Sequence, residues 1–468
     1  NALTPLERVH TNPASLARTR ERIGLITEAA RRAGAYVAGA GSRTVAPTDD
    51  AVAGLGAFRT SLPENPRPAR EVLEELDAFG SPATVVTTHG RHFGFVTGGT
   101  DAAAGAAAIL AGAWDQNPGA YSPVAEAIDE VACAWIVDAL GLPSTTVAAF
   151  NGGATIANLT GIIAGRDALL ARHGWDVAER GLAGAPTLRV IVGEEAHVSV
   201  LKSLRLAGFG QAHIDRVPTD ASGAIDATQF PEDTDALTLV VLQAGNVNTG
   251  TSDPFAAIIP GVRERGGWVH VDGAFGLWAA ASPRLRHLVA GVNLADSWAT
   301  DGHKWLNLPY DSGVVAVRDG ADLHRAMHSD ADYLPADPTA MRNRGIQISQ
   351  RARGVEAWAM LASHGRSGLA DLVDRSCAHA ALLAQLLADG GAEIIAPVAL
   401  NQVLVRFGDD AATQAVIAAV QAEGTTWAGG TVWHGRHAMR LSVSDTATTA
   451  DDVRAAVAAI LEAAAATR

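Results

Sequence analysis

Lysine is almost absent from this chain of 468 residues. Lysine and arginine together number 36, but Lys202 and Lys304 are the only lysines. An arginine side chain keeps its proton in a protein, whereas a lysine can lose its proton when it is buried or crowded. A position that keeps lysine in such a chain therefore indicates a need for a free amine, although an ordinary surface lysine is the simpler interpretation of either residue alone.

Further absences exclude whole classes of protein. Cys133 and Cys377 are too few for a disulfide framework, and no apolar run reaches the ~18 residues of a membrane-spanning helix. A net charge of −14 argues against the basic face that binds nucleic acid. Residues 1–7 lack the basic and apolar stretches of a secretion signal. We therefore expect a cytoplasmic protein that binds neither nucleic acid nor a membrane.

Short apolar runs alternate with helical segments through the middle of the chain. A hydrophobic content of 48% is enough for a large core. Strands that alternate with helices are typical of an α/β fold, in which a mostly parallel sheet is covered on both faces. Ligands bind such sheets at the carboxyl ends of the strands. The expected strands are residues 147–150, 188–192, 238–243, 268–272, 294–298 and 313–317.

The organisation differs on either side of this α/β segment, which we expect to be a large domain at residues 86–329. Residues 1–85 are predicted to form helices that cannot make a core alone, so they should pack on a partner subunit. Residues 330–368 are predicted to be a mobile loop and a linking helix. Within them, residues 334–349 contain two prolines and no apolar periodicity, which is compatible with a lid. Residues 369–468 are expected to form a smaller α+β domain.

Glycines follow the first expected strand and precede a helix. Gly152 and Gly153 would let the backbone approach an anion, and the helix N-terminus would supply free N–H groups and a positive dipole. Thr155 could cap this helix and bind a phosphate oxygen. The alternative is a plain tight turn with Thr155 as its cap.

Three more candidates lie at the ends of strands. Asp272 ends the strand at 268–272, where a carboxylate is costly unless it is paired. A protonated pyridine nitrogen would pair it; a salt bridge is an alternative, and a metal is not expected because no second ligand occurs at the usual spacing. His197 could stack on a planar ring, or simply begin a helix. Lys304, in a turn after a strand, would supply the amine for a Schiff base with pyridoxal phosphate.

These motifs occur together in a characteristic order. They are Asn151-Gly152-Gly153-Ala154-Thr155, His197, His270-Val271-Asp272-Gly273-Ala274-Phe275 and Asp301-Gly302-His303-Lys304-Trp305. From about His89 to the C-terminus, the chain resembles the group II pyridoxal-phosphate-dependent decarboxylases, the family of glutamate, aromatic amino acid, histidine and diaminobutyrate decarboxylases. The resemblance implies the aspartate-aminotransferase type of fold (fold type I), pyridoxal 5'-phosphate as cofactor, and a homodimer with active sites at the subunit interface.

The resemblance also implies roles for single residues. Lys304 would form the Schiff base, Asp272 would pair with the pyridine nitrogen, and His197 would stack on one ring face with Ala274 on the other. The phosphate would be held by Gly153, Ala154, Thr155 and His303. The substrate pocket would be lined by Phe93, Phe95 and Thr97, with Arg440 nearby.

The Cα proton donor is where the chain departs from this family. The decarboxylases usually carry a tyrosine in the loop that corresponds to residues 334–349, but this loop has none, and Tyr333 lies just before it. The expected reaction is decarboxylation of an L-amino acid to the amine and carbon dioxide. The first alternative is oxidative decarboxylation with deamination to an aldehyde. The second alternative is a different lyase reaction or an aminotransferase reaction. A catalytically silent homologue is disfavoured because Lys304, Asp272 and His197 are all present.

The substrate side chain is not decided by these motifs. Phe93, Phe95 and Trp114 favour an aromatic amino acid, whereas Arg91 or Arg342 could select an acidic one.

Overall fold

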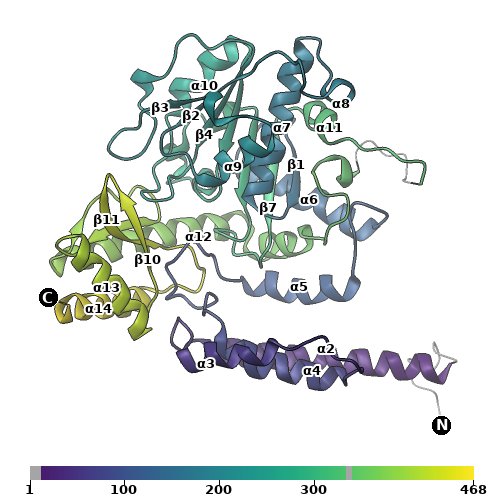
Figure 1. The fold of residues 1–468 in the computed structure, drawn as a ribbon, viewed down its shortest axis with the longest axis vertical. Helices are drawn as coiled ribbons and strands as arrows, with labels where there is room; N and C mark the ends of the chain where they lie inside the picture. The colour runs from purple at the N-terminus through teal and green to yellow at the C-terminus, as the bar shows by residue number, and fades with distance from the viewer. Residues whose placement is uncertain (1–11, 334–339, 468) are drawn as a thin grey trace.

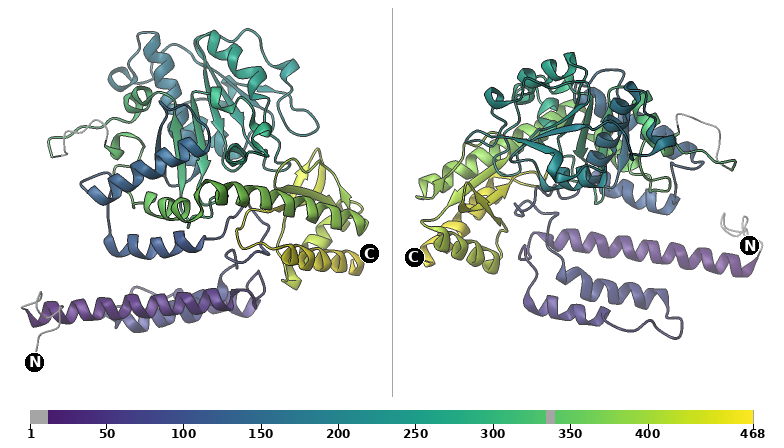
Figure 2. Two further views of the ribbon diagram at one scale, coloured as in Figure 1. Left: turned by 180° about the vertical axis from the view of Figure 1, so that it is seen from behind. Right: turned by 45° about the horizontal axis from the view of Figure 1, so that its top comes forward.

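The first helices form a layer of their own beside the rest of the chain. The computed structural model describes residues 12–333 and 340–467. Figures 1 and 2 show these helices side by side beneath the body of the molecule. Asn12 begins the first helix by accepting a hydrogen bond from Ala14 N at 2.9 Å, and Pro13 suits the first helical position. The helices of this N-terminal layer are α2 (Pro13–Ala40), α3 (Asp49–Gly54) and α4 (Ala69–Glu75).

The body is built on a seven-stranded sheet with the order β1-β7-β6-β5-β4-β2-β3. The pairings among β3, β2, β4, β5 and β6 are all parallel, whereas β7 runs antiparallel to both β6 and β1. This confirms the expected α/β fold with a mostly parallel sheet. The strands are β1 (Val147–Asn151), β2 (Arg189–Gly193), β3 (Ile214–Val217), β4 (Thr238–Gln243), β5 (Trp268–Asp272), β6 (Ser297–Asp301) and β7 (Gly313–Val317).

Two strands differ from the sequence-based expectation. The strand expected at residues 294–298 is wrong in position, because Val292–Leu294 forms a 3-10 turn and β6 runs from Ser297 to Asp301. The shift places Asp301 at the end of the strand. The edge strand β3 was not expected at all, because two of its four residues are exposed and it lacks an apolar run.

Helices cover both faces of the sheet, and each face has its own core. On one face, α7, α9 and α11 pack over residues such as Val190 and Trp268. On the other, α6, α10 and α12 pack over residues such as Val240 and Val269. No helix within residues 12–333 and 340–467 is long and apolar enough to span a membrane. The helices are α5 (Ala102–Trp114), α6 (Pro123–Ala139), α7 (Ala154–Arg172), α8 (Val177–Arg180), α9 (Val198–Leu206), α10 (Phe255–Glu264), α11 (Gly320–Met327) and α12 (Gly354–Asp389).

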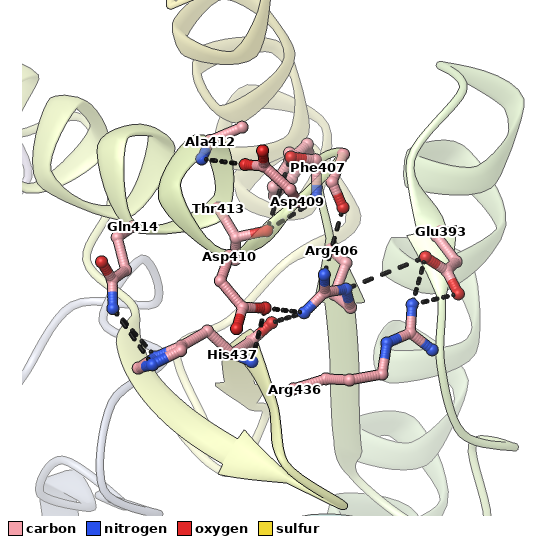
Figure 3. Close-up of polar contacts among 11 residues, drawn as sticks. Glu393, Arg406, Phe407, Asp409, Asp410, Ala412, Thr413, Gln414, Arg436 and His437 are labelled. Carbon is pink, nitrogen blue, oxygen red and sulfur yellow. Dashed lines mark hydrogen bonds and ion pairs between the residues drawn. The ribbon is translucent and has the colours of Figure 1, made fainter.

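The chain ends in a smaller α+β unit, which α12 enters after a kink at Gly365, where φ is 61° and ψ is −174°. Its four strands are antiparallel, in the order β10-β11-β9-β8. Arg406 joins three of its elements by donating to Asp410 Oδ1 at 2.6 Å and to the His437 carbonyl oxygen at 2.5 Å (Figure 3). The elements are β8 (Glu393–Ile394), β9 (Gln402–Arg406), α13 (Asp410–Glu423), β10 (Gly429–Trp433), β11 (Arg436–Ser442) and α14 (Ala450–Ala466).

The segment expected to be a mobile loop is partly packed on the body. Residues 334–339 lie outside the described residues, but Met341–Asn343 form a 3-10 turn against α11. Met341 is 4% exposed within the core beneath α7, and Arg342 is 3% exposed. The predicted mobile loop therefore includes a turn whose side chains are buried against the body, and its mobility stays a prediction. A single apolar anchor, Met341, leaves no periodic pattern in the sequence.

Candidate active site

Lys304 lies in the turn that follows β6. Its Nζ atom is 3.1 Å from Asp301 Oδ2, and the side chain of Asp301 is buried. The other carboxylate oxygen of Asp301 accepts a hydrogen bond from the Ala154 backbone N–H at 2.5 Å. Asp301 therefore links the lysine to the start of α7. The sequence motif includes Asp301, but no role was predicted for it, because the expected strand ended before it.

The start of α7 offers unused donors beside Lys304. Gly153 precedes the helix with a φ of 118°, and a Cβ on Gly313 would overlap the Gly153 backbone, so neither position accepts a side chain without strain. Asn151 Nδ2 and Ser312 Oγ are buried without a hydrogen-bond partner among the described residues. Orphaned polar atoms at a helix N-terminus fit an anion such as a phosphate.

The local structure places two of the expected phosphate ligands, Thr155 and His303. Thr155 lies inside the first turn of α7, which begins at Ala154, so the prediction that Thr155 caps the helix is wrong. The cap position is Gly153, which has no side chain. His303 Nδ1 accepts a hydrogen bond from Ser312 N at 3.1 Å. Burial lowers the pKa of His303, so the neutral ring carries its hydrogen on Nε2.

Asp272 ends β5 at the same edge of the sheet as Lys304. It is 3% exposed, and its Oδ1 accepts a hydrogen bond from Ala274 N at 3.2 Å. Burial raises the pKa of Asp272, whereas the neighbouring His197 and Lys304 lower it. A buried carboxylate that needs a positive partner fits the nitrogen of a pyridinium ring.

His197 begins α9 and also stands close to Asp272. Its Nδ1 accepts a hydrogen bond from Ser199 N at 3.2 Å and lies 2.8 Å from Ser199 Oγ. Burial lowers the pKa of His197, and Asp272 opposes that shift. The hydrogen bonds from its own helix fix the imidazole, so the helix-start role and a role beside a planar ring are compatible.

A family model described as the pyridoxal-dependent decarboxylase conserved domain matches residues 55–408. The chain belongs to this family. Tryptophan decarboxylase 1 of Oryza sativa is 27% identical over 440 residues, 85% of this chain and 85% of that protein. The aromatic-L-amino-acid decarboxylase of Bacillus atrophaeus is 26% identical, over 78% of this chain and 77% of its own. The crystal structure of Oryza sativa TDC with PLP and tryptamine superposes with a TM-score of 0.86, at 24% identity, over 99% of both chains.

This decarboxylase uses pyridoxal phosphate, and its fold is that of the pyridoxal-phosphate decarboxylases, fold type I. The site fits the cofactor at three points. Lys304 offers an amine, Asp272 offers a buried carboxylate, and Asn151 and Ser312 offer polar side chains without partners beside the start of α7. All three lie at the edge of the sheet where β1, β5 and β6 end.

The loop expected to line the substrate pocket of the decarboxylase divides into buried and exposed parts. Phe93 is 1% exposed and packs in the core of the smaller unit, so its expected place in the pocket stays a prediction. Phe95 is 67% exposed, and Thr97 is buried with its carbonyl oxygen accepting from Ser444 Oγ at 3.0 Å. Phe95 and Val96 adopt φ values of 57° and 55°, a strained conformation for such residues that is often found at ligand sites.

An aromatic platform beside this loop was not found from the sequence. His92 and Phe95 both stack on Trp427, each with ring centroids 5.2 Å apart. Trp427 comes from the smaller unit, just before β10, and its carbonyl oxygen accepts from Phe93 N at 2.9 Å. The only signal in the sequence was an isolated tryptophan in a polar, glycine-rich stretch. The platform presents aromatic surface at the junction of the two units.

The turn of Lys304 is held in place from both units. A Cβ on Gly98 would overlap the Lys304 carbonyl oxygen, so the loop after Phe95 passes directly over this turn. The side chain of Asn307 donates to the Ser444 carbonyl oxygen at 2.9 Å, and its Oδ1 accepts from Thr446 N at 2.7 Å. The smaller unit therefore helps to position the lysine.

The arginines expected near the substrate lie in different places. Arg440 of β11 donates to the Val247 carbonyl oxygen at 2.8 Å, and burial lowers its pKa. No ion pair is recorded for Arg440 within the described residues. Arg91 instead donates to the Gly41 carbonyl oxygen at 2.8 Å, and Arg342 is buried in the turn beside α11. These placements weaken the case for acidic substrates. Trp114 is exposed at the end of α5.

Proposed function

We propose that this decarboxylase converts an aromatic L-amino acid to its amine and carbon dioxide, with Lys304 as the residue that carries the cofactor. The observation that supports it best is the shared sheet edge. A partly buried lysine, a buried aspartate and a helix N-terminus with free donors converge there, and they match the amine, ring-nitrogen and phosphate requirements of one molecule.

Asp272, Asp301 and Arg440 would each have a different role at this edge of the sheet. Bound pyridoxal phosphate supplies an electron sink for the bond that breaks at Cα. Asp272 would keep the ring nitrogen protonated, because an ionised carboxylate in a dry site favours a cation beside it. Asp301, 3.1 Å from Lys304 Nζ, would hold the amine toward α7. Arg440 would attract the carboxylate of the substrate, since its buried charge is not balanced by an ion pair among the described residues.

The aromatic platform supports an aromatic substrate. Phe95 and Trp427 offer flat apolar surface that packs well against a second ring, with aromatic pairs worth about 0.5–1.5 kcal/mol beyond area burial. Two relatives with broad coverage are named for tryptophan and for aromatic L-amino acids. The side chain of the substrate would lie against Phe95, while Arg440 engages its carboxylate.

The aldehyde remains the second candidate, because residues 334–349 contain no tyrosine. A relative named phenylacetaldehyde synthase, from Petunia hybrida, is 25% identical over 59% of this chain. Tyr310 favours the amine instead. Its ring contacts that of His303 in a tilted arrangement with centroids 4.3 Å apart, so a phenol stands next to the proposed cofactor site. Tyr333 is 84% exposed.

Product analysis tests the proposal. The protein is incubated in air with each L-amino acid, and carbon dioxide, amine, aldehyde and peroxide are quantified. We expect aromatic amino acids to give amine and carbon dioxide in equal amounts without peroxide. Tyr310→Phe should slow amine formation and raise the aldehyde share, while Tyr333→Phe, the matched control, should not. Release of carbon dioxide from no amino acid contradicts decarboxylation, and stoichiometric peroxide from the wild type selects the aldehyde reaction.

We also propose that the enzyme is a cytoplasmic homodimer with shared active sites. The N-terminal layer and α5 present exposed apolar residues, and a cavity of about 590 Å³ opens between α2 and α4. Val37 and Leu76 line this cavity, and exposed apolar surface around a cavity is typical of an interaction site. The residues are Ile26, Val37, Leu76, Ile109 and Leu110. The segment at residues 1–85 would pack on the second copy. The two free cysteines suit a reducing compartment.

A further inference from the structure

Asp272 belongs to a row of side chains that faces α7. Trp268, His270 and Asp272 alternate along β5, so all three point to the same face of the sheet. The helix approaches them closely. A Cβ on Gly161 would lie 2.6 Å from His270 Cε1, and a Cβ on Gly165 would lie 2.7 Å from Trp268 Cδ1. Glycines in α7 therefore make room for the two rings beside Asp272.

A buried chain of hydrogen bonds runs along this row. Trp268 Nε1 donates to Ser297 Oγ at 2.9 Å, and Ser297 Oγ lies 2.8 Å from His270 Nδ1. His270 Nε2 lies 2.9 Å from Asn158 Oδ1, which can only accept, so Nε2 carries the hydrogen. Burial lowers the pKa of His270 to about 3. The neutral ring then accepts the Ser297 hydroxyl hydrogen on Nδ1, and every donor points toward Asn158.

This chain of hydrogen bonds ends at the side-chain amide of Asn158, which has an unused N–H donor. Asn158 is 0% exposed, and its Nδ2 atom has no partner at hydrogen-bonding distance within the described residues. No hydrogen bond joins this amide to Asp272 within the described residues, but the amide lies close enough to oppose the rise that burial causes in the pKa of Asp272. The opposite amide orientation would turn the Oδ1 lone pairs toward a carboxylate, which is electrostatically unfavourable. The donor from His270 therefore decides which end of the amide faces Asp272.

We propose that His270 and Asn158 are positioning residues, which hold Asp272 ionised and correctly placed for the ring nitrogen of the cofactor. The proposal rests on the proposed function. His270 acts through Asn158, and Asn158 acts through Asp272. Without the histidine donor the amide is free to rotate, and without the amide the buried carboxylate loses a neighbouring N–H dipole that favours its charged form.

Cofactor binding separates this role from a merely structural one. The full chain is freed of cofactor and titrated with pyridoxal phosphate, and separately with its 1-deaza analogue, which has carbon in place of the ring nitrogen. We expect His270→Leu to weaken binding of pyridoxal phosphate at least tenfold. His270→Gln, which keeps an N–H for Asn158, should restore affinity to within about threefold of the wild type. The analogue should bind both variants and the wild type alike, because it cannot pair with Asp272.

The near-isosteric Asn158→Asp serves as the second variant if His270→Leu does not fold. It should bind pyridoxal phosphate more weakly than the wild type does, and it should bind the analogue as well as the wild type does. Equal weakening of both ligands would overturn the proposal, because it would show only a disturbed core. An unchanged affinity of His270→Leu for pyridoxal phosphate would overturn it as well. Failure of the wild type to bind pyridoxal phosphate at all would instead contradict the proposed function, so the two failures are distinguishable.

Discussion

At the scale of single residues, Asp272 carries the electrostatics of the site. It is a buried carboxylate with His197 and Lys304 beside it. Removing one partner of a buried charge pair costs about 3–5 kcal/mol, which corresponds to roughly 10²- to 10⁴-fold in rate. We expect Asp272→Ala to lose that much kcat and Asp272→Glu to keep part of it. Steady-state kinetics at saturating cofactor measure both, and an unchanged turnover of Asp272→Ala would refute the role.

His92 provides a test of burial at the aromatic platform. Burial lowers its pKa to about 4, from an ordinary value of 6.5. Because the folded value is depressed, the unfolded chain binds a proton first as the pH falls below 6.5, and stability is lost until about pH 4. By pH 5 this amounts to about 2 kcal/mol.

The comparison that isolates His92 is the wild type against His92→Gln, which does not titrate. Urea denaturation at pH 7.5 and pH 5 measures both proteins. The stability of the wild type relative to the variant should fall by about 2 kcal/mol between the two pH values. A difference that stays constant would mean that His92 is not buried as a neutral ring.

The residues that sequence reasoning found are those with chemistry typical of a motif, such as Lys304 and Asp272. The role of Asp301 and the contact made by Trp427 were missed for different reasons. Asp301 acquires its contacts from the true end of β6, which a shift of the predicted strand concealed. Trp427 meets Phe95 only because two distant segments pack together, and such a contact has no local signature.

At the scale of elements, the approach of α7 to β5 depends on glycine. Gly161→Ala would place a methyl group 2.6 Å from His270 Cε1 in the core, and overpacking of this kind costs about 1–3 kcal/mol. Gly261 in α10 is the matched control, since its added Cβ would meet only the tip of the flexible Arg265. Gly261→Ala should be neutral or stabilising by up to about 1 kcal/mol. Thermal unfolding distinguishes them, and equal effects would contradict the close approach.

Elements were predictable where the pattern is strong and local. The buried strands β4, β5 and β7 match the expected ranges at both ends, because continuous apolar runs bounded by turns identify them. Thr155 was assigned to the cap because the helix start is set by Gly153 and its positive φ, which composition does not reveal. The Met341 turn was missed because its single apolar residue is buried by distant segments.

At the scale of the whole molecule, the N-terminal layer shows surface that a single chain leaves uncovered. We expect two chains per particle in sedimentation equilibrium. Val37→Glu with Leu76→Glu should shift the particle toward one chain and reduce activity, since the two side chains are 64% and 58% exposed on the apolar face. Arg265→Glu, at the exposed C-terminal cap of α10, is the control for added negative charge. A wild-type protein that remains a single chain at high concentration would contradict the dimer.

Lys304 is proposed to carry the cofactor, and the near absence of other lysines makes this role directly measurable. The purified protein is reduced with borohydride, digested with trypsin and mapped by mass. Modified Lys304 resists trypsin, so we expect a phosphopyridoxyl group on one uncut peptide that spans residues 287–318. Lys202, exposed on α9, should remain unmodified. A phosphopyridoxyl group on Lys202, or on neither lysine, would contradict the assignment.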